Sequence, residues 1–182
     1  PFLVTCLANI SWIFAWHHNQ VVLSLVLMLI LFTALIQIYR LLGDDTRTTT
    51  SYWFLRLPFS VYTGWITVAT LANLSALQLH FGWQDLPIAE AHMTILKIAV
   101  AATVGVTLLF LKRDVAFALV VVWACIGIAV ANNPYPLVQG AASGVAVLGL
   151  LIVIVERILK VALRLRAADL TDHQLDRNNT LY

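Results

Sequence analysis

The stretch LRLPFSVYTGWITVATLAN, residues 55–73, decides the class of fold. It lies in a long apolar segment, yet it carries a proline, a tyrosine, a tryptophan and an asparagine. At about 100° per residue of an α-helix, its polar and aromatic residues share one face. That face comprises Pro58, Tyr62, Trp65, Ala69 and Asn73, and it continues through Ala76 and His80. In lipid such a face must turn toward other helices or a cavity, because unpaired polar groups are costly in hydrocarbon.

The composition of the whole chain indicates a membrane protein. It is 61% hydrophobic and 11% charged, whereas soluble domains have roughly 25% charged residues. Several apolar runs have the length of about 20 residues that crosses a bilayer as a helix, and the alternation typical of a membrane β-barrel is absent. We therefore predict an all-α, polytopic helical membrane protein with no soluble domain.

Six transmembrane helices are expected in this chain. The spans are 1–17, 20–42, 55–80, 88–111, 115–132 and about 137–156. The chain opens on Pro1 inside an apolar run, so we expect a preceding part that this sequence lacks.

The placement of basic residues predicts the orientation. Ten lysines and arginines fall on one side of the predicted spans, and the loops at 17–20, 81–88 and 132–137 have none. The ten are Arg40, Arg47, Arg56, Lys112, Arg113, Arg157, Lys160, Arg164, Arg166 and Arg177. By the positive-inside rule the basic side and the C-terminus are cytoplasmic, and a bacterial inner membrane is the default expectation.

The first span repeats the pattern of the opening stretch, because Asn9, Trp12 and Trp16 share one face. Tryptophan and tyrosine offer flat faces for stacking on a planar ring, and Asn73 offers both a donor and an acceptor. Ala69 leaves room where a larger side chain would fill it. The same residues are also ordinary contacts between transmembrane helices. A ligand pocket and a packed helix contact are therefore both open on the pattern alone.

The pattern Asn9-x-x-Trp12, followed by Tyr62-x-x-Trp65-x-x-x-Ala69-Thr70-x-x-Asn73, resembles the TspO/MBR family of tryptophan-rich sensory proteins and translocator proteins. The resemblance implies a helical bundle with an aromatic pocket for porphyrins, haem or similar flat hydrophobic ligands, and for cholesterol in some members. The implied ligand-binding residues are Asn9, Trp12, Tyr62, Trp65, Ala69 and Asn73.

The resemblance covers residues 1–80, and it implies an extended, divergent relative whose N-terminal helices are missing. We expect a TspO-like part at 1–80, an additional three-helix transmembrane region at 81–166 and a cytosolic tail at 167–182.

Lys97 lies about ten residues into the fourth span, near the middle of the membrane. An ionisable group at this depth is a functional hypothesis, such as a proton path or a Schiff-base lysine. The alternative, which we favour, is a structural lysine paired with a carboxylate or with backbone carbonyls between helices. Glu90 lies seven residues earlier on nearly the same helical face.

The remaining residues indicate no conventional enzyme. The adjacent His17 and His18 point about 100° apart and do not form a metal-ligand pair, and no catalytic triad, phosphate loop or metal cluster is present in the sequence. Gly140-x-x-x-Gly144, with Gly149 beyond, predicts a close helix contact within the bundle or between protomers.

Two classes of function remain from the sequence. The first is a sensor-like membrane protein with an intramembrane pocket, and the second is a transporter or an accessory subunit in which the polar face only packs helices. The expected partners are the lipid bilayer, a hydrophobic small molecule and a second copy or larger membrane complex, with no nucleic acid.

Overall fold

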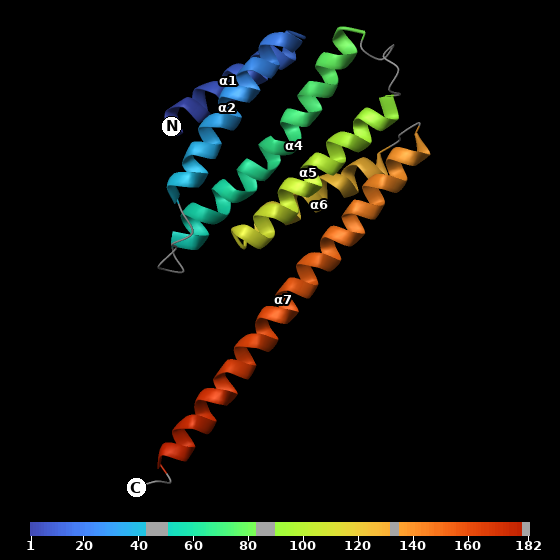
Figure 1. Cartoon of the computed structure of the whole chain (residues 1–182). Helices are drawn as coiled ribbons and strands as arrows, with labels where there is room; N and C mark the ends of the chain where they lie inside the picture. The colour runs from blue at the N-terminus through green and yellow to red at the C-terminus, as the bar shows by residue number, and fades with distance from the viewer. Residues whose placement is uncertain (43–50, 83–89, 132–134, 180–182) are drawn as a thin grey trace.

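The computed structural model describes residues 1–42, 51–82, 90–131 and 135–179, with side chains through residue 167. Throughout these ranges the fold is helical (Figure 1). The helices are α1 (Phe2–His17), α2 (Val21–Leu42), α4 (Leu57–His80), α5 (Glu90–Leu111), α6 (Val115–Val130) and α7 (Pro136–Asn179). A π-helical turn, η1 (Tyr52–Arg56), leads directly into α4. The prediction of an all-α membrane protein is confirmed, whereas much of the predicted loops 81–88 and 132–137 lies outside the described residues.

Three of these helices are long and apolar enough to cross a membrane. They are α2, α5 and the Pro136–Ala167 part of α7, while α1 and α6 are shorter apolar helices. Helix α4 has 24 residues and is long enough to cross a membrane. It is less apolar than those three helices because it carries several serine, threonine and asparagine side chains. The chain is thus an integral membrane protein.

Helix α4 lies between the two halves of the bundle (Figure 1). It packs against α2, which also packs against α1, and on its other side it packs against α5 and α6. Helix α7 covers α5 and α6 and continues well beyond the other helices. One buried core joins α1, α2 and α4 around Met28, Leu31 and Ile66. A second core joins α5, α6 and α7 around Ile98, Phe117 and Val138.

Most hydroxyl groups of α4 are satisfied by its own backbone. They donate to carbonyls four residues earlier, as Thr63 to Phe59, Thr67 to Thr63, Thr70 to Ile66 and Ser75 to Leu71. Such bonds remove the cost of placing a hydroxyl in hydrocarbon. They explain how so polar a helix is accommodated in the middle of the bundle.

One end of the bundle is fastened by the buried carboxylate of Asp114. It accepts a hydrogen bond from the backbone N–H of Phe117 at 3.0 Å and thereby caps the N-terminus of α6. Its oxygens also accept from Tyr39 of α2 and Ser60 of α4, each at 2.5 Å.

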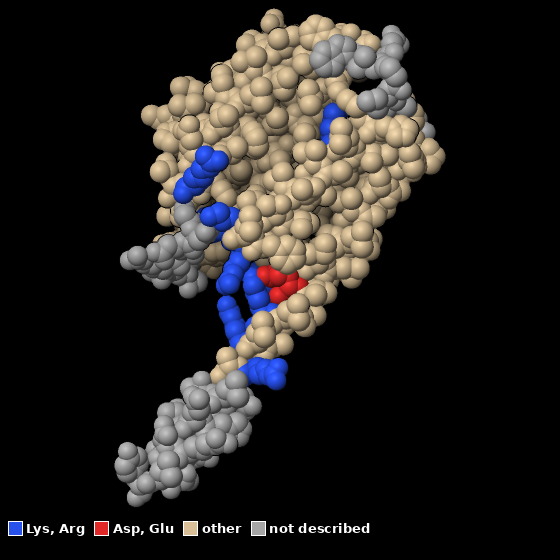
Figure 2. All heavy atoms as spheres, viewed as in Figure 1, with Lys and Arg blue, Asp and Glu red and all other residues tan. Residues whose placement is uncertain are grey.

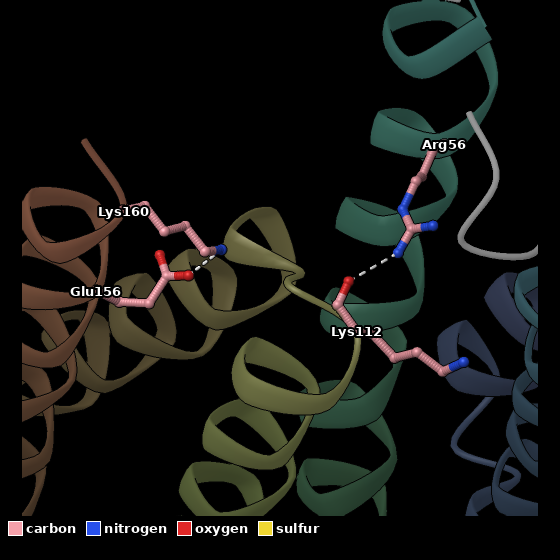
Figure 3. A network of polar contacts seen from close by, with 4 residues as sticks. All are labelled: Arg56, Lys112, Glu156 and Lys160. Carbon is pink, nitrogen blue, oxygen red and sulfur yellow. Dashed lines mark hydrogen bonds and ion pairs between the residues drawn. The ribbon is translucent and has the colours of Figure 1, made fainter. Parts of the chain in front are cut away.

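Most of the basic residues gather at this same end of the bundle and along α7 beyond it (Figure 2). The Arg56 guanidinium donates to the carbonyl oxygen of Lys112 at 3.1 Å, which joins the start of α4 to the end of α5 (Figure 3). In the same view Glu156 forms an ion pair with Lys160 one turn further along α7. The side of the membrane on which this end lies remains a prediction.

The predicted glycine contact is only partly correct. A Cβ added at Gly149 would lie 2.8 Å from Cγ2 of Val122, so α7 packs closely on α6 there. A Cβ at Gly140 or Gly144 would meet nothing within 4 Å. The prediction of a close contact within the bundle is therefore wrong for these two glycines, because both are exposed on α7. A contact between protomers stays a prediction.

Candidate functional site

Asn73 is the polar centre of the contact between α1, α2 and α4. Its side chain is 3% exposed. Its Oδ1 accepts from Ser24 Oγ at 2.7 Å and from Trp12 Nε1 at 3.4 Å, and its Nδ2 donates to the carbonyl oxygen of Ala69 at 3.1 Å. The carboxamide thus links three helices. The sequence pattern identified Asn73 and Trp12 but gave no signal for Ser24, which lies in the mainly apolar first half of its span.

Trp12, Tyr62 and Ala69 lie in the same contact. All three are half-buried and pack against the core of α1, α2 and α4. Asn9 is half-buried on α1, one turn before Trp12. The structure therefore brings together most of the residues that the tryptophan and asparagine pattern indicates.

Trp65 lies apart from this group. Its indole is 45% exposed, and its centre is 5.3 Å from that of Trp123 on α6, with the ring planes at 47°. Helix α4 packs against α2 on one side and α6 on the other. Its polar and aromatic face is wide enough that Asn73 reaches α2 while Trp65 reaches α6. Trp123 carried no signal in the sequence beyond its place in an apolar span.

A cavity of about 340 Å³ lies between α4, α5 and α6, on the side of α4 that faces away from Asn73. Its walls are mainly apolar and include Leu71, Ala72, Ala101, Ala124 and Cys125, and its polar lining includes Ser75 and Lys97. Val68, also in the wall, follows Trp65 by about one helical turn. Pockets for small molecules combine such apolar walls with a few polar groups, and their volumes begin at roughly 300 Å³.

Lys97 is held at this cavity by two side chains of α4. Its ammonium donates to Ser75 Oγ at 2.7 Å and to Gln78 Oε1. The interpretation from the sequence favoured a carboxylate or backbone carbonyls as partners, whereas the contacts in the structure are neutral side-chain oxygens. Lys97 nevertheless links two helices, as expected, because it lies on α5 and both of its partners lie on α4.

Glu90, the acidic residue that the sequence places nearest to Lys97, has a different partner. Its Oε2 accepts a hydrogen bond of 3.0 Å from the hydroxyl of Tyr135, just before α7. This bond to the carboxylate raises the pKa of Tyr135, because it stabilises the protonated phenol. The contact ties the start of α5 to the start of α7.

A family model described as TSPO-like protein matches residues 1–155. The chain belongs to the TSPO-like family. No curated protein and no solved structure matches it. The family match of this TSPO-like chain extends past residue 80 and includes α5, α6 and the part of α7 that packs on them.

The TSPO-like chain therefore offers two places where a ligand could be bound. In one, around Asn73, the polar atoms are already engaged by protein groups. In the other, beside Lys97, there is open volume and an ammonium group with neutral partners. Among the residues that the structure describes, no group of three or more histidine, cysteine or acidic side chains is placed to hold a metal ion.

Proposed function

We propose that this TSPO-like chain binds a flat hydrophobic molecule of the porphyrin or haem kind inside its helical bundle. The observation that carries the proposal is the cavity of about 340 Å³ between α4, α5 and α6. Its mainly apolar walls suit a planar ring system, and its few polar groups would orient the ligand.

Two tryptophans that adjoin wall residues along the chain support this class of ligand, since Trp65 precedes Val68 by about one turn and Trp123 precedes Ala124. Trp65 and Trp123 form an aromatic pair that leaves both indoles partly exposed. Aromatic faces stack on planar rings and contribute about 0.5–1.5 kcal/mol beyond the burial of area. A tetrapyrrole is larger than the cavity, so it would fill the cavity and extend past its open side toward such a pair.

A second candidate function is supported by the other residues that the family resemblance implies for ligand binding, Asn9, Trp12, Tyr62, Ala69 and Asn73. The hydrogen bonds that Asn73 accepts from Ser24 and Trp12 favour a contact that holds α1, α2 and α4 together. On that evidence the chain would be an accessory subunit of a larger membrane complex, or a transporter, in which this face only packs helices.

The deciding experiment is a titration of the purified protein in lipid nanodiscs with protoporphyrin IX and with haem, followed by quenching of tryptophan fluorescence. Two matched variants locate the site. Ala124→Leu adds volume to the wall of the cavity, and Ala69→Leu adds the same volume between α1, α2 and α4.

We expect Ala124→Leu to block binding in a folded protein, because the added side chain occupies space that the ligand needs. Ala69→Leu should bind the porphyrin and lose about 1–3 kcal/mol of stability through overpacking. The reverse result would move the site to the residues around Asn73. If neither porphyrin nor haem binds to the unmodified protein, the accessory function is supported instead.

A further inference from the structure

We propose that Lys97 makes the cavity selective for hydrophobic ligands that carry a carboxylate group. The carboxylate would pair with the Lys97 ammonium while the apolar body of the ligand fills the space between α4, α5 and α6. The inference rests on the proposed function and names the chemical class of ligand that the same cavity takes.

The first support is the surroundings of the ammonium. It lies in the wall of an otherwise mainly apolar cavity, and its recorded partners are the uncharged oxygens of Ser75 and Gln78. Hydrogen bonds to uncharged oxygens give the ammonium no opposite charge from either partner, and Glu90 acts on it only through space, without an ion pair. Charged groups within a membrane normally pair with an opposite charge or with backbone carbonyls, and Ser75 and Gln78 supply neither.

The second support is the position of the nearest acidic side chain. Within the described parts of α4, α5 and α6, the three helices that form the cavity, Glu90 is the only acidic residue. Its carboxylate accepts a hydrogen bond from Tyr135 at the start of α7. The structure therefore places no ion pair on Lys97 from these three helices, and an anionic ligand would supply one.

The third support is the number of hydrogen-bond donors. A lysine ammonium has three N–H groups, and Ser75 and Gln78 accept from two of them. A ligand carboxylate can accept from the third without displacing either partner. The two side chains of α4 then act to position the ammonium at the wall of the cavity, next to the apolar residues that contact the rest of the ligand.

The test compares protoporphyrin IX with its dimethyl ester, which keeps the flat ring and removes both negative charges. Affinities are measured by tryptophan quenching for the unmodified protein and for Lys97→Met, Lys97→Arg and Lys112→Met. Lys112→Met is the matched control because it removes the same charge at the basic end of the bundle, and the Lys112 carbonyl that binds Arg56 is kept. Thermal unfolding of each variant reports whether it is folded.

We expect the unmodified protein to bind the acid at least about tenfold more tightly than the ester, since hydrogen bonds to charged groups are the stronger kind. Lys97→Met should bind the acid about as weakly as the ester, whereas Lys97→Arg and Lys112→Met should keep the preference for the acid. Retention by Lys97→Arg shows that the loss in Lys97→Met follows the charge and not a defect in folding.

Equal affinity of the unmodified protein for acid and ester would overturn this inference and leave the proposed function standing. A folded Lys97→Met variant that keeps the full preference for the acid over the ester would also overturn the inference and leave the proposed function standing. If neither form binds to the unmodified protein, the proposed function fails, and the selectivity fails with it.

Discussion

The phenol of Tyr39 donates a hydrogen bond of 2.5 Å to the carboxylate of Asp114, which lies 75 residues away in the sequence. Ser60 donates to the other oxygen of the same carboxylate at 2.5 Å. Asp114 is 5% exposed, and its bond with Ser60 is buried while its bond with Tyr39 is partly buried. One side chain from a short turn therefore holds α2, α4 and α6 in a fixed relation.

Replacing this carboxylate should destabilise the bundle. In Asp114→Ala the cap of α6 is lost, which costs about 1 kcal/mol, and the Tyr39 and Ser60 hydroxyls lose their acceptor, which costs about 1–3 kcal/mol more. Thermal unfolding in detergent measures the sum. Asp114→Asn keeps an acceptor oxygen and should lose clearly less, and an unchanged unfolding midpoint for Asp114→Ala would show that the carboxylate does not hold these helices.

Asn73 should contribute to stability through its contact with Ser24. Hydrogen bonds between transmembrane helices are worth about 0.6 kcal/mol on average and up to about 1.7 kcal/mol. Asn73→Ala and Ser24→Ala should each cost an amount in this range. The double variant should cost less than the sum, because both changes remove the same 2.7 Å bond. Additive losses, together with abolished porphyrin binding in Asn73→Ala alone, would instead assign Asn73 to a ligand.

The glycines of α7 should respond in opposite ways to the same substitution. Gly149→Ala places a methyl group 2.8 Å from Val122 Cγ2, so the Val122 side chain or the two helices must shift, and the variant should be less stable by about 1–3 kcal/mol. Gly140→Ala enters open space and should gain up to about 1 kcal/mol from helix propensity. Chemical unfolding of the two variants side by side makes the comparison.

A weaker self-association of Gly140→Ala, seen in cross-linking or in sedimentation, would reveal a contact between protomers at this glycine. Equal stability of Gly149→Ala and the unmodified protein would contradict the close approach of α7 to Val122.

The orientation can be tested with single cysteines at exposed positions of the two ends. In a background with Cys6→Ala and Cys125→Ala, a cysteine at Gln20 should react with a membrane-impermeant maleimide in intact cells. A cysteine at Lys112 should react only after the membrane is opened, because the basic end is expected in the cytosol. Labelling of Lys112→Cys alone in intact cells would reverse the orientation.

The helical fold could be predicted from the sequence because the length of an apolar run and the period of a helix are local properties. The direction in which each residue of a face points could not, because it depends on which helices are neighbours. Asn73 and Trp65 share a face of α4 by sequence, yet one contacts Ser24 of α2 and the other contacts Trp123 of α6.

The polar contacts of the site show the same limit. The depth of Lys97 in the membrane follows from its position in an apolar span. Its partners Ser75 and Gln78 could not be predicted in this way, because they lie on another helix. Asp114 follows two basic residues in a short turn and has the sequence context of a solvent-exposed group. Its burial results from Tyr39 and Ser60, which no pattern around residue 114 contains.

Helix α7 can convert a small change of tilt into a large displacement. It is continuous over 44 residues, which at 1.5 Å per residue is about 66 Å and roughly twice the thickness of a bilayer core. If α7 rotated by about 10° about Gly149, its end at Asn179 would move by roughly 8 Å, because 30 residues at 1.5 Å each make an arm of about 45 Å. A tilt of α7 that followed a change in its packing on Val122 would therefore be largest at the end of the helix that lies far from the bundle.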